Sequence, residues 1–191
     1  NEGIKKNKIK VVGDVMYDLA LKFSKKKPST FCNRLMKFKP YILVTIHRQE
    51  NTDNHEKLVN ISNALIEFSK KFRIIWPLHP RTKNKLSEYK LFDHLTKNVE
   101  FIEPQGYINM INLLKNAILV VTDSGGVQKE AYYFKTSCVT VREETEWVEL
   151  LNTNWMKLCA PSSKNKIVKH LNLGLKTKGK NCLLYGKGDA S

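Results

Sequence analysis

The sequence predicts an α/β fold with three layers, in which a doubly wound parallel sheet carries helices on both faces. From residue 41 onward, short apolar runs alternate with longer amphipathic segments, which is the pattern of strands followed by helices. The short runs are apolar throughout, which is typical of strands buried on both faces of a parallel sheet. With 191 residues, the chain is long enough for one domain with a hydrophobic core.

The local pattern defines each element in turn. The run YILVTI at 41–46 predicts a buried strand, and apolar residues recur at helical spacing over 55–70. The run ILVVT at 118–122 predicts the most apolar strand, and a helix over 126–134 follows two glycines. The other predicted strands are 73–76, 99–102, 139–141 and 156–158, and the other predicted helices are 82–91, 107–115 and 161–173.

Residues 1–40 stand apart from this alternation. We expect a strand over 9–12 and a helix after it, but the Lys-rich stretch 25–40, which contains proline, separates both from the rest. The chain begins with Asn instead of Met, which suggests a trimmed or partial protein. At the other end, 174–191 is rich in Gly and Lys and stops without a capped helix. We therefore expect a crossover or linker over 1–40, one Rossmann-like domain over 41–173 and a truncated segment over 174–191.

The charge favours an anionic ligand. The net charge is +15, from 33 Lys and Arg against 18 Asp and Glu, and such an excess suits nucleic acid, an acidic surface or a phosphorylated substrate. Scattered lysines explain the excess equally well. The lysines are densest at 25–27 and 164–187, and no aromatic and basic stripe accompanies them. We therefore do not expect the chain to bind nucleic acid.

Other features narrow the class of protein. No apolar stretch approaches the roughly 20 residues that span a bilayer, so we expect no membrane partner, and the N-terminus lacks the pattern of a secretory signal. The four cysteines lie far apart without a CxxC pair, so we expect no disulfide, metal site or cofactor, and a cytoplasmic location. The sequence does not fix the oligomeric state, and a homodimer is among the states that it allows.

The segment VVTDSGGVQKEA at 120–131 carries the strongest candidate site. Its strand leads through Ser124, Gly125 and Gly126 into a helix, whose first N–H groups and partial positive charge bind phosphate readily. Glycines allow the backbone to approach phosphate oxygens closely, and Glu130, about one turn further on, could accept from ribose hydroxyls. The same pattern also fits an ordinary strand-to-helix turn in which Ser124 is the N-cap.

Four further polar motifs follow predicted strands. His47, after the first, could bind an anion or exchange a proton near neutral pH, although a histidine at a strand end is more often structural. Gln105 lies in EPQGY, whose polar groups could bind a base, and Arg142 begins the acidic segment REETEW. In WPLHPRT at 76–82, two prolines make a rigid turn. Because the carboxyl ends of parallel strands meet at one edge, we expect all five motifs to converge on one crevice.

Together these motifs resemble the non-hydrolysing UDP-N-acetylglucosamine 2-epimerases, over roughly residues 9–188. REETEWVEL and the IHR variant are most similar to the branch with UDP-2,3-diacetamido-glucuronate 2-epimerases of surface-polysaccharide pathways. The resemblance implies a glycosyltransferase-B architecture of two Rossmann-like domains, of which this chain is the C-terminal, UDP-binding one. The matching segments are, in order, VTIHRQENTDN, PLHPRT, IEPQGYINMINLLKNA, VVTDSGGVQKEAYYF and VTVREETEWVELL.

The resemblance also implies a role for each candidate residue. The segment 124–126 would hold the phosphates, Glu130 the ribose and Gln105 the uracil end. His47 would lie near the diphosphate and matter for catalysis. In the family, removal of the proton at C2 allows anti elimination of UDP, and UDP adds back after the proton returns on the other face. The carboxylates that move this proton belong to the N-terminal domain, which this chain lacks.

Two positions depart from the family pattern. Trp147 stands where the better-known branch has an arginine, so a phosphate contact is absent or supplied by Arg142. Met110 stands where other members have an aromatic residue near the uracil. We predict a UDP-N-acetylglucosamine 2-epimerase that converts UDP-GlcNAc to UDP-ManNAc. The open alternatives are a UDP-2,3-diacetamido-glucuronate 2-epimerase, a nucleotide-sugar glycosyltransferase of the same architecture, and a non-catalytic basic fragment that binds nucleotide or nucleic acid.

Overall fold

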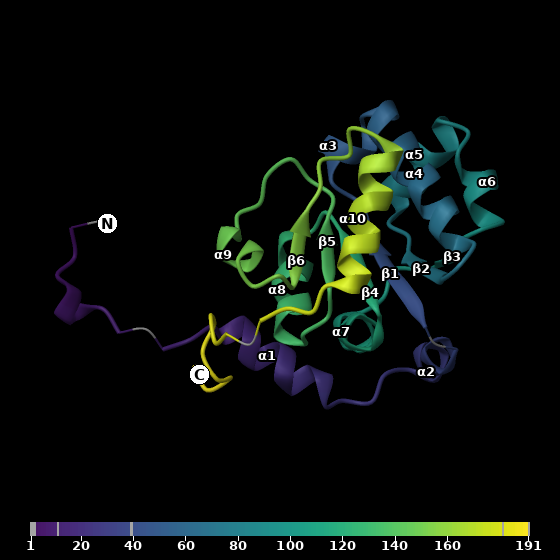
Figure 1. Ribbon diagram of the computed structural model, residues 1–191. Coiled ribbons are helices and arrows are strands. Elements are labelled where there is room, and N and C mark those ends of the chain that lie inside the picture. The colour runs from purple at the N-terminus through teal and green to yellow at the C-terminus, as the bar shows by residue number, and fades with distance from the viewer. Residues whose placement is uncertain (1–2, 11, 39, 181, 191) are drawn as a thin grey trace.

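The computed structural model describes residues 3–10, 12–38, 40–180 and 182–190, and the chain adopts the predicted three-layer α/β fold (Figure 1). The six-stranded sheet is parallel throughout, in the order β3-β2-β1-β4-β5-β6. The strands are β1 (Tyr41–Thr45), β2 (Arg73–Pro77), β3 (Glu100–Ile102), β4 (Leu119–Thr122), β5 (Cys138–Thr140) and β6 (Met156–Leu158).

The apolar runs explain why β1 and β4 occupy the centre of the sheet. Every residue of these two strands is buried, and they pair with each other over the full length of β4. Successive side chains along a strand point to opposite faces. Ile42 of β1 therefore belongs to one hydrophobic core and Leu43 to a second core on the other face.

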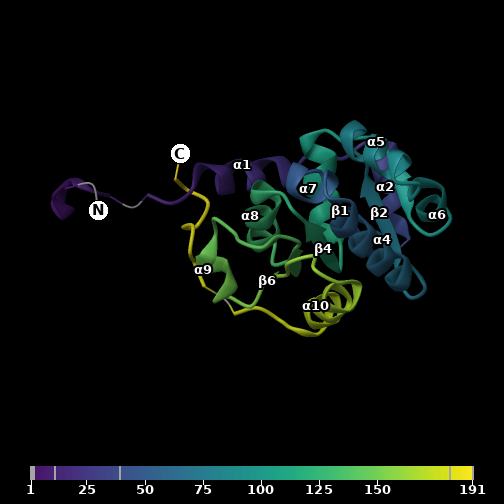
Figure 2. The same cartoon turned by 90° about the horizontal axis from the view of Figure 1, so that it is seen from above.

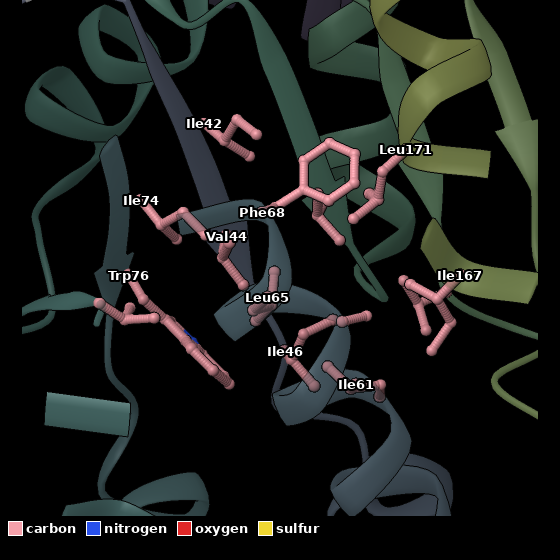
Figure 3. Packing of buried hydrophobic residues seen from close by; sticks show 14 of the residues in the cluster. Ile42, Val44, Ile46, Ile61, Leu65, Phe68, Ile74, Trp76, Ile167 and Leu171 are labelled. Atoms are coloured by element: carbon pink, nitrogen blue, oxygen red, sulfur yellow. The ribbon is translucent and has the colours of Figure 1, made fainter. Parts of the chain in front are cut away.

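The first core lies under α4, α5, α6 and α10. Figure 3 shows Leu65 of α4 and Leu171 of α10 on the same side of the sheet as Val44. Burial of each such side chain contributes about 1.5–3 kcal/mol to the stability of the fold. Gly174 lets α10 approach the sheet closely, because a Cβ at this position would lie 2.8 Å from Cδ1 of Leu119. These helices are α4 (His55–Ser69), α5 (Pro80–Glu88), α6 (Phe92–Thr96) and α10 (Lys164–Lys176).

The second core lies on the opposite face, where α1 and α2 pack on α7 and α1 also packs on α8. The C-terminal segment returns to α1, and the carbonyl oxygen of Tyr185 accepts a hydrogen bond of 3.1 Å from the N–H of Asp14. Residues 3–10 extend away from the α/β body in both views (Figures 1 and 2). The helices are α1 (Val15–Ser24), α2 (Thr30–Lys37), α7 (Tyr107–Asn116) and α8 (Gly125–Tyr133).

The winding of the chain determines where a ligand can bind. The helices after β1 and β2 cover the first face, and those after β3 and β4 cover the second. The chain therefore reverses its direction across the sheet between β1 and β4. In doubly wound sheets, ligands bind beyond the carboxyl ends of the strands at such a point. We call this place the β1–β4 crevice.

The structure corrects the prediction near the N-terminus. The predicted strand over 9–12 is wrong, since residues 9, 10 and 12 are not in a strand and residue 11 lies outside the described residues. A strand needs partners for its backbone N–H and C=O groups, and no strand in the described part of the chain pairs with this segment. The helix predicted after it is confirmed as α1. The prediction missed α2, which lies within the Lys-rich stretch, and the short helices α3 (Gln49–Thr52), α6 and α9 (Val148–Leu151).

Candidate functional site

Asp123 organises the β1–β4 crevice. Its side chain is fully buried and accepts hydrogen bonds from the backbone N–H groups of His47, at 3.1 Å, and Arg48, at 2.9 Å. The side-chain amide of Asn51 donates to the same carboxylate at 3.1 Å and to the carbonyl oxygen of Val141 at 2.9 Å. Asp123 and Asn51 therefore join the ends of β1, β4 and β5 and fix the backbone of His47 and Arg48.

This anchoring places the His47 imidazole at the crevice. Its Nδ1 lies 3.8 Å from Oδ1 of Asp123, and 43% of the side chain is exposed. The His79 ring centroid lies 6.2 Å from that of His47, but His79 caps α5, because its Nδ1 accepts a hydrogen bond of 3.2 Å from the N–H of Arg81. His47 thus keeps an accessible ring that can hold or move a proton, whereas His79 has a structural role.

Helix α8 begins at the crevice without a side-chain cap. Ser124 occupies the N-cap position, but its hydroxyl accepts no hydrogen bond from the start of the helix. Side chains cap α1, α2, α4, α5 and α10, whereas α3, α6, α7 and α9 begin without a side-chain cap, as α8 does. An uncapped start leaves N–H groups and a partial positive charge available to an anion. The space beside Gly126 is open, since a Cβ there would meet no atom within 4 Å. The capped-turn alternative therefore does not describe Ser124.

Glu130 lies one to two turns along α8 and meets the first residue of α7. The hydroxyl of Tyr107 donates a hydrogen bond to the Glu130 carboxylate. Burial raises the pKa of Glu130 to about 7, and this hydrogen bond has the smaller, opposite effect of lowering it. Burial also raises the pKa of Tyr107 above its usual range. A carboxyl group in this position can exchange Tyr107 for another hydroxyl donor, such as a sugar hydroxyl.

Gln105 lies at the same edge of the sheet, beyond the end of β3. Strands β2 and β1 separate β3 from β4, but α7, which begins two residues after Gln105, packs on α8. The side-chain amide of Gln105 donates to the carbonyl oxygen of Glu103 at 2.8 Å and accepts from Asn109 at 2.9 Å. A ligand that reached both Gln105 and Ser124 would have to extend along this edge.

Arg142 follows β5 and is held by two carboxylates. Its side chain is only 5% exposed. Nε donates to Glu50 at 3.0 Å, and Nη1 donates to the two oxygens of Glu146 at 2.9 and 2.7 Å. Burial alone would lower the pKa of Arg142, but the two carboxylates outweigh it and raise the pKa. The Nε and Nη1 donors of Arg142 are therefore already occupied by Glu50 and Glu146.

The sequence-based prediction missed the residues that hold the site together. Asp123 was visible as an acid directly after the most apolar strand, and a buried carboxylate needs hydrogen-bond donors. Nothing in the sequence identified His47, Arg48 and Asn51 as those donors. Trp147 donates its indole N–H to the carbonyl oxygen of Gly125 at 2.9 Å and so connects the 142–147 segment to α8.

The described residues contain no group of three or more His, Cys, Asp or Glu side chains that could hold a metal ion. In the same part of the chain, every helix is too short or too polar to cross a bilayer.

Comparison with known proteins identifies the family. The sequence profile described as UDP-N-acetylglucosamine 2-epimerase matches residues 1–191. A UDP-N-acetylglucosamine 2-epimerase homolog of Methanococcus maripaludis is 48% identical over 177 residues, which cover 90% of this chain and 48% of that protein. The UDP-2,3-diacetamido-2,3-dideoxy-D-glucuronate 2-epimerase of Pseudomonas aeruginosa is 41% identical over 195 residues, which cover 100% of this chain and 53% of that protein.

A solved structure gives the same result. The UDP-GlcNAc 2-epimerase of Methanocaldococcus jannaschii, in complex with UDP-GlcNAc and UDP, matches with a TM-score of 0.86 and 38% identity, covering 99% of this chain and 54% of that one. The chain thus spans about half the length of the relatives that it matches, and the predicted fold class, one Rossmann-like half of a glycosyltransferase-B architecture, is confirmed. Because the profile covers its whole length, the chain belongs to the UDP-N-acetylglucosamine 2-epimerase family.

Proposed function

We propose that this chain binds the UDP half of the substrate of a UDP-N-acetylglucosamine 2-epimerase, which converts UDP-GlcNAc to UDP-ManNAc by elimination and re-addition of UDP. The observation that carries the proposal is the uncapped start of α8 beside His47 in the β1–β4 crevice. The Methanocaldococcus jannaschii relative, solved with UDP-GlcNAc and UDP, supports it.

In this proposal, the segment 124–126 binds the diphosphate and Glu130 accepts hydrogen bonds from the ribose in place of Tyr107. Gln105 binds the uracil end along the edge of the sheet, and Arg142 holds Glu50 and Glu146 beside the phosphate site. Catalysis by this half is electrostatic. UDP leaves as an anion, and the N–H donors at the start of α8 and the nearby imidazole stabilise the negative charge as it develops. Transfer of the C2 proton requires residues outside this chain.

A UDP-2,3-diacetamido-glucuronate 2-epimerase is the second candidate, because the Pseudomonas aeruginosa enzyme of that activity matches the whole of this chain. The two candidates share UDP and differ in the sugar. A UDP-binding measurement on residues 1–191 therefore tests both candidates at once. Turnover of each UDP-sugar by a protein that contains both halves distinguishes them.

Calorimetric titration of residues 1–191 with UDP tests the proposal. We expect weak UDP binding and no epimerisation of UDP-GlcNAc by this chain alone. Ser124→Ala should weaken UDP binding about tenfold or more, since a hydrogen bond to a charged group contributes about 1.5–3 kcal/mol. The substitution should leave the stability unchanged, because the Ser124 hydroxyl caps nothing.

Ser163→Ala is the matched control. Its hydroxyl caps α10 by accepting a hydrogen bond of 3.3 Å from the N–H of Lys166, so the variant should lose about 1 kcal/mol of stability and keep its affinity for UDP. A wild-type chain that does not bind UDP, or a Ser124→Ala variant that binds it equally well, would contradict the proposal. Binding of single-stranded DNA that collapses with added salt would support the basic fragment instead.

A further inference from the structure

The start of α8 is flanked by a carboxylate as well as by cations. A Cβ built on Gly125 would lie 3.6 Å from Oε2 of Glu146 and 4.0 Å from Nη2 of Arg48. Glu146 therefore places a negative charge beside the positive end of the helix, where a carboxylate is favoured for the same reason as a phosphate. Two anions cannot both use this region without repulsion.

Glu146 belongs to a set of four alternating charges, Arg48, Glu50, Arg142 and Glu146. Arg142 is the fixed member, since it is buried and makes contacts of 2.7–3.0 Å to both carboxylates. Arg48 is the loosely held member. It is 35% exposed, and it lies 3.4 Å from Glu146 and 4.0 Å from Glu50. Because Arg142 holds Glu146 more closely than Arg48 does, the Arg48 side chain can turn away from Glu146 without opening the core.

We propose that the Glu146 carboxylate takes the place of the substrate's phosphate at the start of α8. Glu146 pairs with Arg48 there until a diphosphate displaces it from Arg48. This inference rests on the proposed function and adds to it a residue that sets the affinity for the phosphate. On binding, Arg48 exchanges the Glu146 carboxylate for a phosphate oxygen. Glu146 stays on Nη1 of Arg142, at 2.9 and 2.7 Å, so Arg142 keeps both carboxylates while Arg48 turns.

Arg48 is anchored at its backbone and held more loosely at its guanidinium group. Asp123 fixes the backbone of Arg48 through the hydrogen bond of 2.9 Å, and Glu146 holds the end of its side chain. The guanidinium group therefore stays near the start of α8, and the exchange of Glu146 for a phosphate oxygen requires only a side-chain movement.

Titration of the wild-type chain and of Glu146→Gln with UDP and with uridine tests the inference. Glutamine keeps an oxygen for Arg142 but removes the competing charge, so we expect UDP to bind about three- to fivefold more tightly, the range of a partly exposed charge pair. Uridine has no phosphate to compete with Glu146, so its affinity should not change.

Glu143→Gln is the matched control, because it removes one charge from the same segment. Glu143 pairs with Lys57 at 2.7 Å and is exposed, and its loss should leave UDP affinity unchanged. Unchanged or weaker UDP binding by Glu146→Gln would overturn the inference, as would an equal gain for uridine or for Glu143→Gln. Failure of the wild-type chain to bind UDP would instead refute the proposed function, on which the inference rests.

Discussion

Asp123→Ala is the substitution that most directly tests how the crevice is held together. The carboxylate is fully buried and accepts hydrogen bonds from the N–H groups of His47 and Arg48 and from the amide of Asn51. Alanine removes the acceptor and leaves all three donors in place. The strands β1, β4 and β5 would then lose the side chain that joins their carboxyl ends.

The cost follows from the surroundings of each donor. An unsatisfied buried donor costs about 1–3 kcal/mol. The N–H groups of His47 and Arg48 are only partly buried and can regain water, so we assign each about 1 kcal/mol, whereas the Asn51 amide is buried and costs about 2 kcal/mol. The sum is about 4 kcal/mol, a large share of the roughly 5–15 kcal/mol that stabilises a typical domain.

Urea unfolding followed by circular dichroism measures this loss. With a slope of about 3 kcal/mol per molar urea, the midpoint should fall by about 1.3 M. Asp93→Ala is the matched control, because Asp93 is exposed in the first turn of α6, and its loss should cost less than about 1 kcal/mol. If Asp123→Ala unfolds at the same urea concentration as Asp93→Ala, the reasoning about Asp123 is wrong.

Two further predictions concern α8 and α10. The folded chain raises the pKa of Glu130 from 4.5 to about 7, so it binds more protons than the unfolded chain between these pH values. Its stability should therefore fall by up to about 3 kcal/mol as the pH rises through this window, and Glu130→Gln should remove this decline in urea midpoints measured at pH 5 and pH 8. Gly174→Ala should cost about 1–3 kcal/mol, because its Cβ would lie 2.8 Å from Leu119 and 3.1 Å from Val139. Gly126→Ala, whose Cβ meets no atom within 4 Å, should not lower the melting temperature, and equal melting of the two glycine variants would count against the close packing of α10.

The sequence predicted the central elements well because burial on both faces leaves a continuous apolar run. The strand predicted over 41–46 is β1 (Tyr41–Thr45), and the strand predicted over 118–122 is β4 (Leu119–Thr122). Short helices such as α3 and α9 have four residues each, which is too few for a 3.6-residue period to show. Helix α2 was missed because the lysines around it and the neighbouring prolines outweighed its short apolar stripe.

The candidate site was predicted as a set of strand ends, and its internal geometry was not. The spacing of polar motifs after strands placed His47, Ser124 and Gln105 at one edge, since parallel strands share a carboxyl edge. In the observed strand order, β1 and β4 are neighbours, so His47 and Ser124 follow adjacent strands. Gln105 follows β3, which is not adjacent to either of them. Strand order depends on crossovers between distant segments, so no local pattern encodes it.

The sequence by itself determined the alternation of strands and helices, the position of the glycines at the start of α8 and the family to which the chain belongs. Each of these depends on short motifs whose residues are close together along the chain. Only the tertiary structure decided which charges meet. In the sequence, Arg142 looks like a side chain that is free to bind phosphate. In the structure, its Nε donates to Glu50, 92 residues away along the chain, at 3.0 Å. Packing across the sheet determines the partners of each charged side chain, and these partners determine how readily its charge can interact with a ligand.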